Sequence, residues 1–378
     1  MARATSPAAL RLPTVNRSPA NSLVSVIVLN YNGARWLERC LESLRAQTIF
    51  DQMEVILADN VSSDGSERLG KQMVESWPRG VFIQHSQNLG YCDGNNRAAE
   101  AAHGRYLLFL NNDTWLEPDC LEQLLAEVQR TGAGAAAPLT LNYEDNSFQS
   151  LGAFGFDLFG LASTRACAAQ TREVLMPEGC AYLIERELFQ DLGRFDPEFF
   201  MFADEFDLSW RVWISGHQAV AVPSAKLHHR GAAQVNPAGG GATLEFRTSD
   251  TKRFYTNRNG LLVLLKNAQH LLLLLVPLQL GLLAIEAIAG LAMVRRPSFV
   301  KRAYWDAVMD CWRLRKHILA ERRRIRRFRR RGDLWMLRFL RWRLNRWDEV
   351  QRLRRFGVPK VTDTSKHEAQ TPDLPHGQ

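Results

Sequence analysis

The sequence lacks the motifs that mark several large classes of α/β protein. It contains no G-x-x-x-x-G-K-[ST] loop, and no G-x-G-x-x-G follows its first apolar run. The first motif cradles the phosphates of nucleoside triphosphates and the second binds dinucleotides. Their absence therefore argues against a P-loop NTPase and against a dinucleotide-dependent dehydrogenase.

Cysteine is scarce and scattered. The six cysteines form no C-x-x-C pair and show no metal-ligand spacing: Cys40, Cys92, Cys120, Cys167, Cys180 and Cys311. We therefore expect reduced thiols in a cytoplasmic protein rather than a disulfide or zinc framework. Residues 1–21 have no apolar stretch of signal-peptide length and are rich in Ala, Pro and Ser. We interpret them as a disordered arm.

Positive charge is concentrated in one part of the chain. Of the 378 residues, 295–360 hold 23 Lys and Arg against six Asp and Glu, although the whole chain has a net charge of only +8. A mildly acidic body thus carries a strongly basic tail. The length allows one large domain or two ordinary ones.

One apolar stretch has the features of a central strand. Residues 106–110 are continuously apolar, and Asn111, Asn112 and Asp113 follow them directly. Such a run is typical of a buried parallel strand. Ligands of open α/β sheets lie beyond the carboxyl ends of the strands, where a carboxylate can hold a divalent cation that bridges phosphate oxygens. Taken alone, the three polar residues could equally form an ordinary turn.

Other predicted strands end in the same way. The runs 24–29, 55–58 and 81–84 are followed by polar clusters that contain Asn30 and Asn32, Asp59 and Asn60, and Asn88. Helical patterns alternate with these strands, which predicts a parallel α/β sheet. Four Asn/Asp clusters at one sheet edge indicate a polar ligand there.

A second acidic cluster lies farther along the chain. Asp204, Glu205 and Asp207 begin a predicted helix that runs to about residue 215. Three carboxylates this close repel one another unless they face solvent, a cation or the positive end of the helix dipole. An acidic helix start is the simpler interpretation. The surrounding phenylalanines favour a raised carboxyl pKa, which suits a general base.

Six segments, in this order and at these spacings, resemble glycosyltransferase family 2, and more narrowly its rhamnosyltransferase-like bacterial branch. They are VSVIVLNYNG, ADNVSSDGS, NLGYCDGNN, LFLNND, GRFDPEFFMFADEFDLSWR and PSAKLHH, within residues 22–265. The resemblance implies a GT-A fold, a Rossmann-like and mostly parallel sheet with flanking helices. It also implies a nucleotide diphosphate sugar as donor, dTDP-rhamnose being one candidate, and a divalent cation, Mn²⁺ or Mg²⁺.

The resemblance assigns roles to individual residues. Those expected to contact the nucleotide sugar are Asn30, Asn32, Asp59, Asn60, Asn88, Asn96, Asn112 and Asp113. Among them, Asp59 would accept a hydrogen bond from the nucleobase imide. Because NND replaces the family's D-x-D, Asp113 would be the main metal ligand. His229 would be the second metal ligand, with His228 as the alternative.

The expected catalytic pair departs from the family pattern. The family's Glu-Asp order is reversed here to Asp204-Glu205. By position the base is Glu205, with Asp204 as the alternative, and Asp207 would orient the helix. The base would deprotonate an acceptor hydroxyl that displaces the nucleotide diphosphate from the opposite face of the sugar, which inverts the anomeric carbon.

The C-terminal part differs from the body. Residues 271–294 are apolar and long enough to span a bilayer, but Glu286 near the centre would be costly in a lone span. An interfacial or re-entrant helix is therefore an equal alternative, and a helix buried against the body is a third. The Trp and Arg residues that follow suit an anionic membrane surface, although Arg-rich helices also bind nucleic acid. The apolar segment directly before them favours the membrane.

We therefore expect five segments. These are a disordered arm (1–21), a GT-A domain (22–250), an apolar membrane-associated helical segment (251–300), a basic, Trp-rich helical tail (301–360) and a disordered end (361–378). The predicted function is transfer of a sugar to a lipid-linked or cell-surface glycan on the cytoplasmic face of the membrane, with no nucleic-acid partner. A processive synthase is disfavoured because no Q-x-x-R-W element occurs. A non-catalytic, sugar-nucleotide-binding scaffold remains the alternative.

Overall fold

A computed structural model describes residues 22–163, 168–231 and 246–362. The expected arm at 1–21, most of the expected disordered end and Cys167 lie outside these residues. The other five cysteines are free thiols and are all buried.

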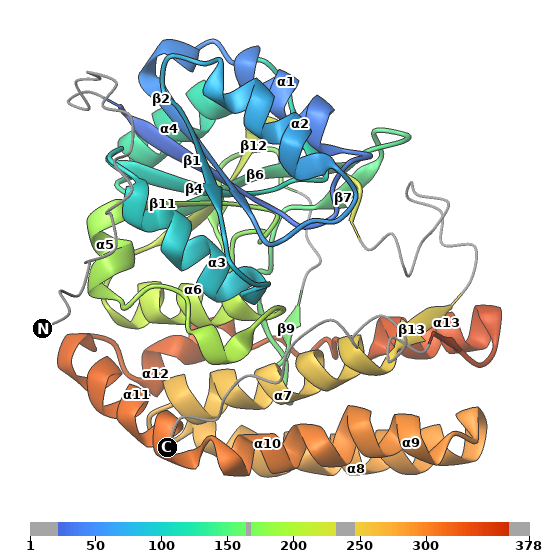
Figure 1. The fold of residues 1–378 in the computed structure, drawn as a ribbon. Helices are drawn as coiled ribbons and strands as arrows, with labels where there is room; N and C mark the ends of the chain where they lie inside the picture. The colour runs from blue at the N-terminus through green and yellow to red at the C-terminus, as the bar shows by residue number, and fades with distance from the viewer. Residues whose placement is uncertain (1–21, 164–167, 232–245, 363–378) are drawn as a thin grey trace, which may run out of the picture.

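The body is built on one large mixed sheet (Figure 1). Its principal strands are β1 (Val24–Asn30), β2 (Met53–Asp59), β3 (Gly80–Gln84), β4 (Tyr106–Asn111), β6 (Ala135–Asn142), β10 (Arg172–Glu173), β11 (Ala181–Glu185) and β12 (Ala219–His229). Their order is β10-β12-β6-β11-β4-β1-β2-β3, with short β5 (Thr114–Leu116) on β12 and β7 (Phe148–Ser150) on β6. A hairpin of β8 (Gly155–Phe156) and β9 (Ala162–Ser163) lies apart from this sheet.

The parallel half of the sheet gathers the predicted strand ends on one edge. β1 lies between β2 and β4, and β3 lies on the far side of β2, all parallel. In this register Asn30 is opposite Asp59, and Asp59 is opposite Gln84. The α/β fold predicted from the alternating pattern is confirmed. Within the central strands β11 breaks the parallel order, because it runs antiparallel to both of its neighbours, β4 and β6; the short strands β5, β7 and β10 also pair antiparallel.

Helices cover both faces of the sheet. One face carries α1 (Leu37–Arg45), α2 (Ser66–Glu75) and α4 (Cys120–Thr131), which share a core with the side chains that alternate along β1. The other face carries α3 (Gly90–Ala98), α5 (Arg186–Asp191) and α6 (Asp204–Ile214). Short 3₁₀ turns lie at η1 (Phe50–Gln52), η2 (Ala99–Ala101) and η3 (Pro197–Phe199). The alternation of inward side chains on β1 and β4 explains why both faces need cover.

A layer of helices packs beneath α6 (Figure 1). It contains α7 (Asp250–Asn267), η4 (Leu272–Leu274), α8 (Leu275–Val294), α9 (Pro297–Val300), the π-helical turn η5 (Lys301–Asp306), α10 (Ala307–Arg313), α11 (Arg315–Phe328), α12 (Asp333–Met336), η6 (Leu337–Phe339) and α13 (Trp347–Phe356). The chain end returns to the start of this layer, because β14 (Lys360–Thr362) pairs with β13 (Arg247–Ser249).

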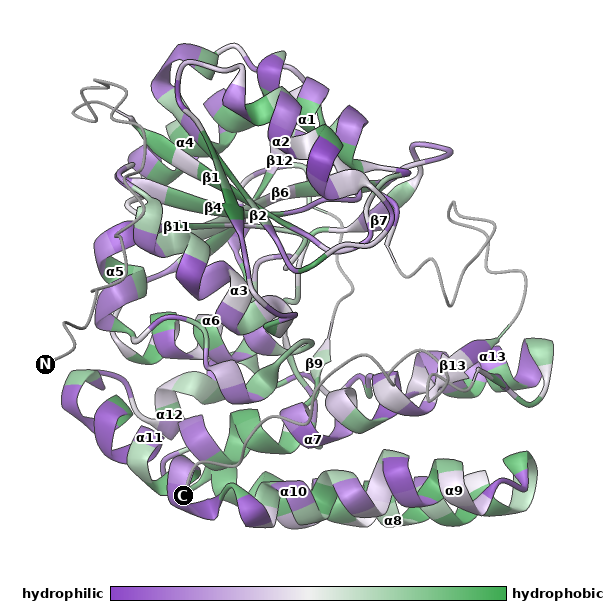
Figure 2. Ribbon diagram, viewed as in Figure 1, coloured by the Kyte–Doolittle hydropathy of each residue, from purple (hydrophilic) through white to green (hydrophobic). Residues whose placement is uncertain are grey.

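The expected segment 251–300 does not behave as one unit. The C-terminal half of α7 is buried, and α7 packs against both α6 and the outer helices. It therefore belongs structurally to the body, which the sequence division at residue 250 did not anticipate. Residues 272–294, which include α8, are long and apolar enough to cross a membrane by length and composition. Figure 2 shows α8 as a largely hydrophobic helix at the outer side of the layer.

Candidate active site

The ends of β1, β2 and β4 are tied together by one buried amide. Asn30 Nδ2 donates to Asp59 Oδ1 (2.8 Å) and to Ser66 Oγ (2.8 Å), and its Oδ1 accepts from Asn112 Nδ2 (2.8 Å). Gly33 makes this approach possible, because a Cβ there would lie 2.2 Å from Asn112 Nδ2. The predicted clustering of Asn30, Asp59 and Asn112 is thus present in the structure.

Asp59 is fully buried and its acceptor positions are all used. It accepts from Asn30, from the backbone N–H (2.8 Å) and Oγ (2.6 Å) of Ser62, and from Gln84 Nε2 (2.9 Å). A carboxylate offers about four such positions. Hence a nucleobase imide can bond to Asp59 only by replacing one of these donors. The exposed Gln84 is the donor best placed to leave, and it was missed because it is a lone polar residue at the end of β3.

Asn32, Asn60 and Asn88 shape the loops around this edge. Asn32 Oδ1 accepts from the backbone N–H of Ser63 (2.8 Å). Asn60 bonds through Oδ1 to His85 Nδ1 (2.8 Å) and donates through Nδ2 to the carbonyl of Gly90 (3.0 Å). Asn88 Oδ1 accepts from the Gly90 N–H (3.0 Å). These side chains lie at the predicted edge but are occupied in holding loops.

The structure does not place Asn96 as a ligand contact. Its amide donates to the carbonyl of Phe195 (2.8 Å) and accepts from the N–H of the same residue (3.1 Å), and the side chain is buried. Asn96 thus fastens α3 to the segment that precedes α6, because α3 begins at Gly90 and Asn96 lies within that helix. Its expected contact with the nucleotide sugar stays a prediction.

Asp113 and His229 come together beyond the ends of β4 and β12. His229 Nε2 lies 3.4 Å from Asp113 Oδ1, and Asn111 Nδ2 lies 3.5 Å from the same ring nitrogen. Burial raises the pKa of Asp113, but bonding to His229 outweighs it and the net pKa is below the usual value. Burial alone would lower the pKa of His229, but Cys180 and Asp113 raise it well above the ordinary value.

His228 faces the other way, as successive residues of a strand must. Its ring stacks on Trp115 with centroids 3.6 Å apart, and its Nε2 lies 3.5 Å from Glu117 Oε1. Of the two histidines, His229 is therefore the one beside Asp113.

The side chains beside Asp113 offer few ligands for a divalent cation. Among the described residues, no group of three or more His, Cys, Asp or Glu side chains could hold a metal ion. Asp113 and His229 nevertheless supply one oxygen and one nitrogen 3.4 Å apart. Adjacent ligands of an octahedral ion with bonds of about 2.1 Å are about 3 Å apart. The pair thus fits two positions of a cation whose other ligands come from substrate oxygens or water.

Asp204, which is buried, and Glu205, which is only partly buried, form an acidic pair at the start of α6. Burial raises the pKa of Asp204 to about 7, and burial together with the Asp204 charge raises the pKa of Glu205 well above its ordinary value. The two carboxyl groups form a hydrogen bond with each other. The pair therefore shares a proton at pH values where an isolated carboxyl group in water would be ionised. The prediction that apolar surroundings would tune this pair agrees with these shifts.

Gly179 and Cys180 connect the two acidic sites. A Cβ at Gly179 would lie 3.1 Å from Glu205 Cδ, so the absence of a side chain at Gly179 makes room for the Glu205 carboxyl group. Cys180 follows directly and interacts with His229, while its carbonyl accepts from the Asn111 N–H (2.9 Å). The carboxylate pair and the Asp113–His229 pair therefore lie on either side of one short stretch at the start of β11.

The loop before α6 is strained and is held from α7. Phe200, Phe202 and Ala203 have φ values of 59°, 67° and 59°, in a region that costs roughly 1–3 kcal/mol for such residues. Asn259 Nδ2 donates to the carbonyls of Phe199 (3.0 Å), Met201 (2.8 Å) and Phe202 (2.7 Å). α7 thus supports the backbone that presents Asp204 and Glu205, which no sequence pattern indicated.

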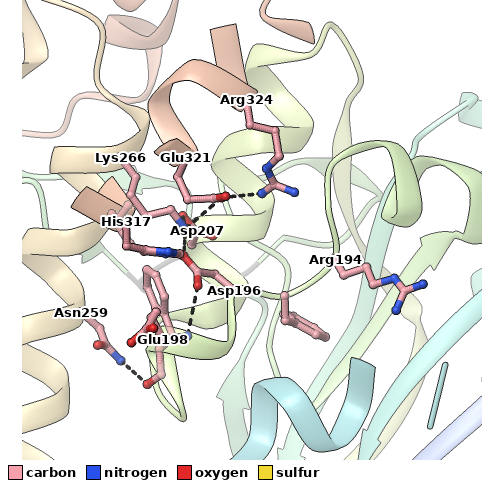
Figure 3. A network of polar contacts seen from close by, with 12 residues as sticks. Arg194, Asp196, Glu198, Asp207, Asn259, Lys266, His317, Glu321 and Arg324 are labelled. Atoms are coloured by element: carbon pink, nitrogen blue, oxygen red, sulfur yellow. Dashed lines mark hydrogen bonds and ion pairs between the residues drawn. The ribbon is translucent and has the colours of Figure 1, made fainter. Parts of the chain in front are cut away.

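A buried charge network fixes α6 one turn farther along (Figure 3). Asp207 accepts from Arg211 Nη2 (2.7 Å), from Lys266 Nζ (3.1 Å) and from Asn267 Nδ2 (2.7 Å). Lys266 also pairs with Asp196, which accepts from His317 Nε2 (2.9 Å). Asp207 is thus a structural residue that orients α6, as expected.

Comparison with known proteins supplies the family. The model for "Glycosyl transferase family 2" matches residues 25–193. Residues 25–193 form a glycosyltransferase family 2 domain. Asp113 lies inside this matched region, whereas Asp204, Glu205, His229 and α7 follow it.

Several known proteins resemble the family 2 domain and its surroundings. A putative glycosyltransferase EpsH of Bacillus subtilis is 32% identical over 137 residues, covering 32% of this chain and 39% of that protein. An N-acetylglucosaminyl-diphospho-decaprenol L-rhamnosyltransferase of Mycobacterium tuberculosis is 27% identical over 238 residues, covering 55% of this chain and 76% of that protein. The crystal structure of GalNAc-T7 with UDP, GalNAc and Mn²⁺ has a TM-score of 0.49 and 20% identity, covering 55% of this chain and 42% of that one.

Proposed function

We propose that this chain is an inverting, nucleotide-sugar-dependent glycosyltransferase. The observation that carries the proposal is the placement of two functional pairs beside Gly179 and Cys180. Asp113 and His229 form one pair, and the carboxyls of Asp204 and Glu205 form the other. A group-transfer enzyme needs one site for the leaving diphosphate and a base for the acceptor within reach of it.

The diphosphate end of the donor would lie beside Asp113 and His229. A divalent cation held by Asp113 and His229 supplies Lewis-acid stabilisation of the leaving diphosphate. Asn112, whose amide is anchored on Asn30, offers a further donor at the same edge. The nucleoside would extend toward Asp59 and Asn60, where Gln84 can exchange its bond to Asp59 for one to the base.

The acceptor hydroxyl would be activated from α6. Either Asp204 or Glu205 can take its proton, because burial raises both pKa values toward the range of an effective base near neutral pH. Glu205 is the better candidate, since its side chain is only half-buried and contacts Gly179, whereas Asp204 is buried. Attack from the face opposite the diphosphate then inverts the anomeric carbon.

We further propose that α8 rests in the plane of a membrane surface. Its exposed face is entirely apolar and includes Leu278, Leu280, Ile285 and Ile288. Its buried face holds Glu286, which pairs with Arg346 Nε (2.8 Å), so the charge that would be costly in a lone span points into the protein. α8 also packs against α7 and η5, which carry ion pairs of their own. A helix lying in the interface explains these features better than a span does.

Membrane association suggests the acceptor. The Mycobacterium relative is named for an acceptor on diphospho-decaprenol, and we propose a lipid-linked glycan acceptor on the cytoplasmic face here. Purified full-length protein should be incubated with a panel of nucleotide sugars, beginning with dTDP-rhamnose, and Mn²⁺ or Mg²⁺. Release of nucleoside diphosphate from at least one donor supports the proposal, and NMR of the product should show an inverted anomeric centre. Binding of a donor with no release of nucleoside diphosphate would favour the non-catalytic, sugar-nucleotide-binding scaffold, and absence of binding to every donor would contradict both functions.

A further inference from the structure

A cavity in the helical layer is lined by arginines and lies outside the site described above. Its volume is about 430 Å³, which is within the range of small-molecule sites. It lies between α11 and the turn that joins α7 to η4. Its lining comprises Lys266, Ala268, Gln269, His270, Leu319, Arg322, Arg323, Arg326 and Arg329.

Two of the four arginines build the cavity wall. Arg322 donates to the carbonyls of Leu265 (2.6 Å) and Ala268 (2.7 Å), and Arg329 donates to the carbonyl of Asn267. These are the carbonyls that the end of α7 leaves without helical partners. Arg322 and Arg329 therefore hold the turn and are not available as ligand-binding groups.

The other two arginines are free to bind. Arg323 and Arg326 are exposed and make no hydrogen bond or ion pair with any residue in the described ranges. The nearby acids are already paired: Asp333 accepts from the N–H groups of Gln269 and His270, and Glu321 bonds to Arg324. The cavity thus presents an excess of positive charge that the protein itself does not neutralise.

Exposed leucines lie in the cavity lining and in the segment that leads from the cavity to α8. Leu319, three residues before Arg322, is 54% exposed. Leu271 follows His270 directly, and Leu274 lies one turn later at the start of the apolar face of α8. A ligand that joins a compact anion to hydrocarbon chains matches this combination of charge and apolar surface.

We propose that this cavity binds the headgroup of a membrane lipid that ends in a phosphate or diphosphate. The inference rests on the proposed membrane association and adds a specific lipid site to it. Arginine suits such a group, because its planar fork donates two parallel hydrogen bonds to phosphate oxygens. The acyl or prenyl chains would leave past Leu319 and Leu271 toward the membrane.

Vesicle binding by the full-length protein tests the site. Vesicles of phosphatidylcholine with phosphatidic acid, a phosphomonoester, are compared with vesicles that carry phosphatidylserine at the same surface charge. The wild type should bind the phosphatidic acid vesicles on the order of tenfold more tightly, as expected for at least one added charged hydrogen bond. Arg323→Gln/Arg326→Gln should lose this preference. Arg323→Lys/Arg326→Lys should keep the charge but weaken the preference.

The matched control removes the same charge from the same helix. Lys316 and Arg327 are exposed residues of α11 that do not line the cavity. Lys316→Gln/Arg327→Gln should weaken binding to both kinds of vesicle equally and leave the preference intact. Equal loss of preference in the control would overturn the proposal, and so would a wild type that binds both vesicles alike.

Three further outcomes test the lipid site, and the first of them separates it from the proposed function. If the wild type transfers sugar but binds no anionic vesicle, both the membrane association and the lipid site are wrong while the enzyme assignment stands. A second outcome concerns inorganic pyrophosphate in solution. If it raises the Tm of the wild type as much as phosphatidic acid vesicles do, and if Arg323→Gln/Arg326→Gln abolishes that rise, the ligand is a soluble anion and the lipid assignment is wrong. Displacement of the vesicles by a short RNA through the same two arginines would also refute it.

Discussion

Replacing Lys266 with methionine should strongly destabilise the protein. The Lys266 side chain is fully buried and pairs with Asp196 and Asp207, so its loss leaves two buried carboxylates short of a cation. Removing one partner of a buried ion pair costs about 3–5 kcal/mol. Asp207 keeps Arg211 and Asp196 keeps His317, so we expect the lower part of this range, about 3 kcal/mol.

The assay is urea denaturation of the wild type and of Lys266→Met, with Lys301→Met as the control. Lys301 pairs with Asp306 at 2.8 Å but is 67% exposed, and such a pair contributes about 0–1 kcal/mol. Lys266→Met should therefore lower the free energy of unfolding by several times as much as Lys301→Met. Equal small losses in the two variants would refute the reasoning that the buried network stabilises α6.

Three further predictions concern pH, the supporting helix and the membrane. Because burial raises the pKa of Asp204 to about 7, kcat should rise with pH through about 7 as the Asp204–Glu205 pair loses its proton. The free energy of unfolding should fall as pH rises from about 4 to 7, since only the folded state keeps that proton. Asp204→Asn should flatten this fall in urea titrations at different pH values. Asn259→Leu should lower kcat at least tenfold with little change in donor Kd, because Asn259 holds the strained loop before α6 and does not contact the nucleotide site. A loss of donor affinity as large as the loss of kcat would argue against a positioning role. Ile285→Glu/Ile288→Glu should release the protein from vesicles in a flotation assay, whereas Val358→Glu, at an exposed site outside α8, should not.

The strand ends were predictable because a run of apolar residues followed by Asn or Asp is a local pattern. Asn30, Asp59 and Asp113 were found in this way, and the parallel register then placed them on one edge. The role of Asn96 was not predictable, since its partner Phe195 is 99 residues away. Glu286 illustrates the same limit: its cost in a lone span was evident, but its partner Arg346 lies sixty residues farther along.

The support that α7 gives to the loop before α6 was hidden for a different reason. Asn259 lies in a helix whose sequence mixes polar and apolar residues on all sides, and nothing local shows that its amide binds three carbonyls of another segment. The reversed order of Asp204 and Glu205 was visible at once, but which of the two carboxyl groups points toward Gly179 depends on the turn that starts α6. Only the three-dimensional contact with Gly179 favours Glu205.

The central claim is that one pair of residues holds the diphosphate and the other activates the acceptor. The most direct test measures donor Kd and kcat for Asp113→Asn and for Glu205→Gln with the donor that the wild type turns over. Asp113→Asn should weaken donor binding, and Glu205→Gln should leave donor Kd near the wild-type value while kcat falls by about 10²–10⁴. A Glu205→Gln variant that transfers sugar at the wild-type rate, or an Asp113→Asn variant that binds donor as tightly as the wild type, would contradict the account.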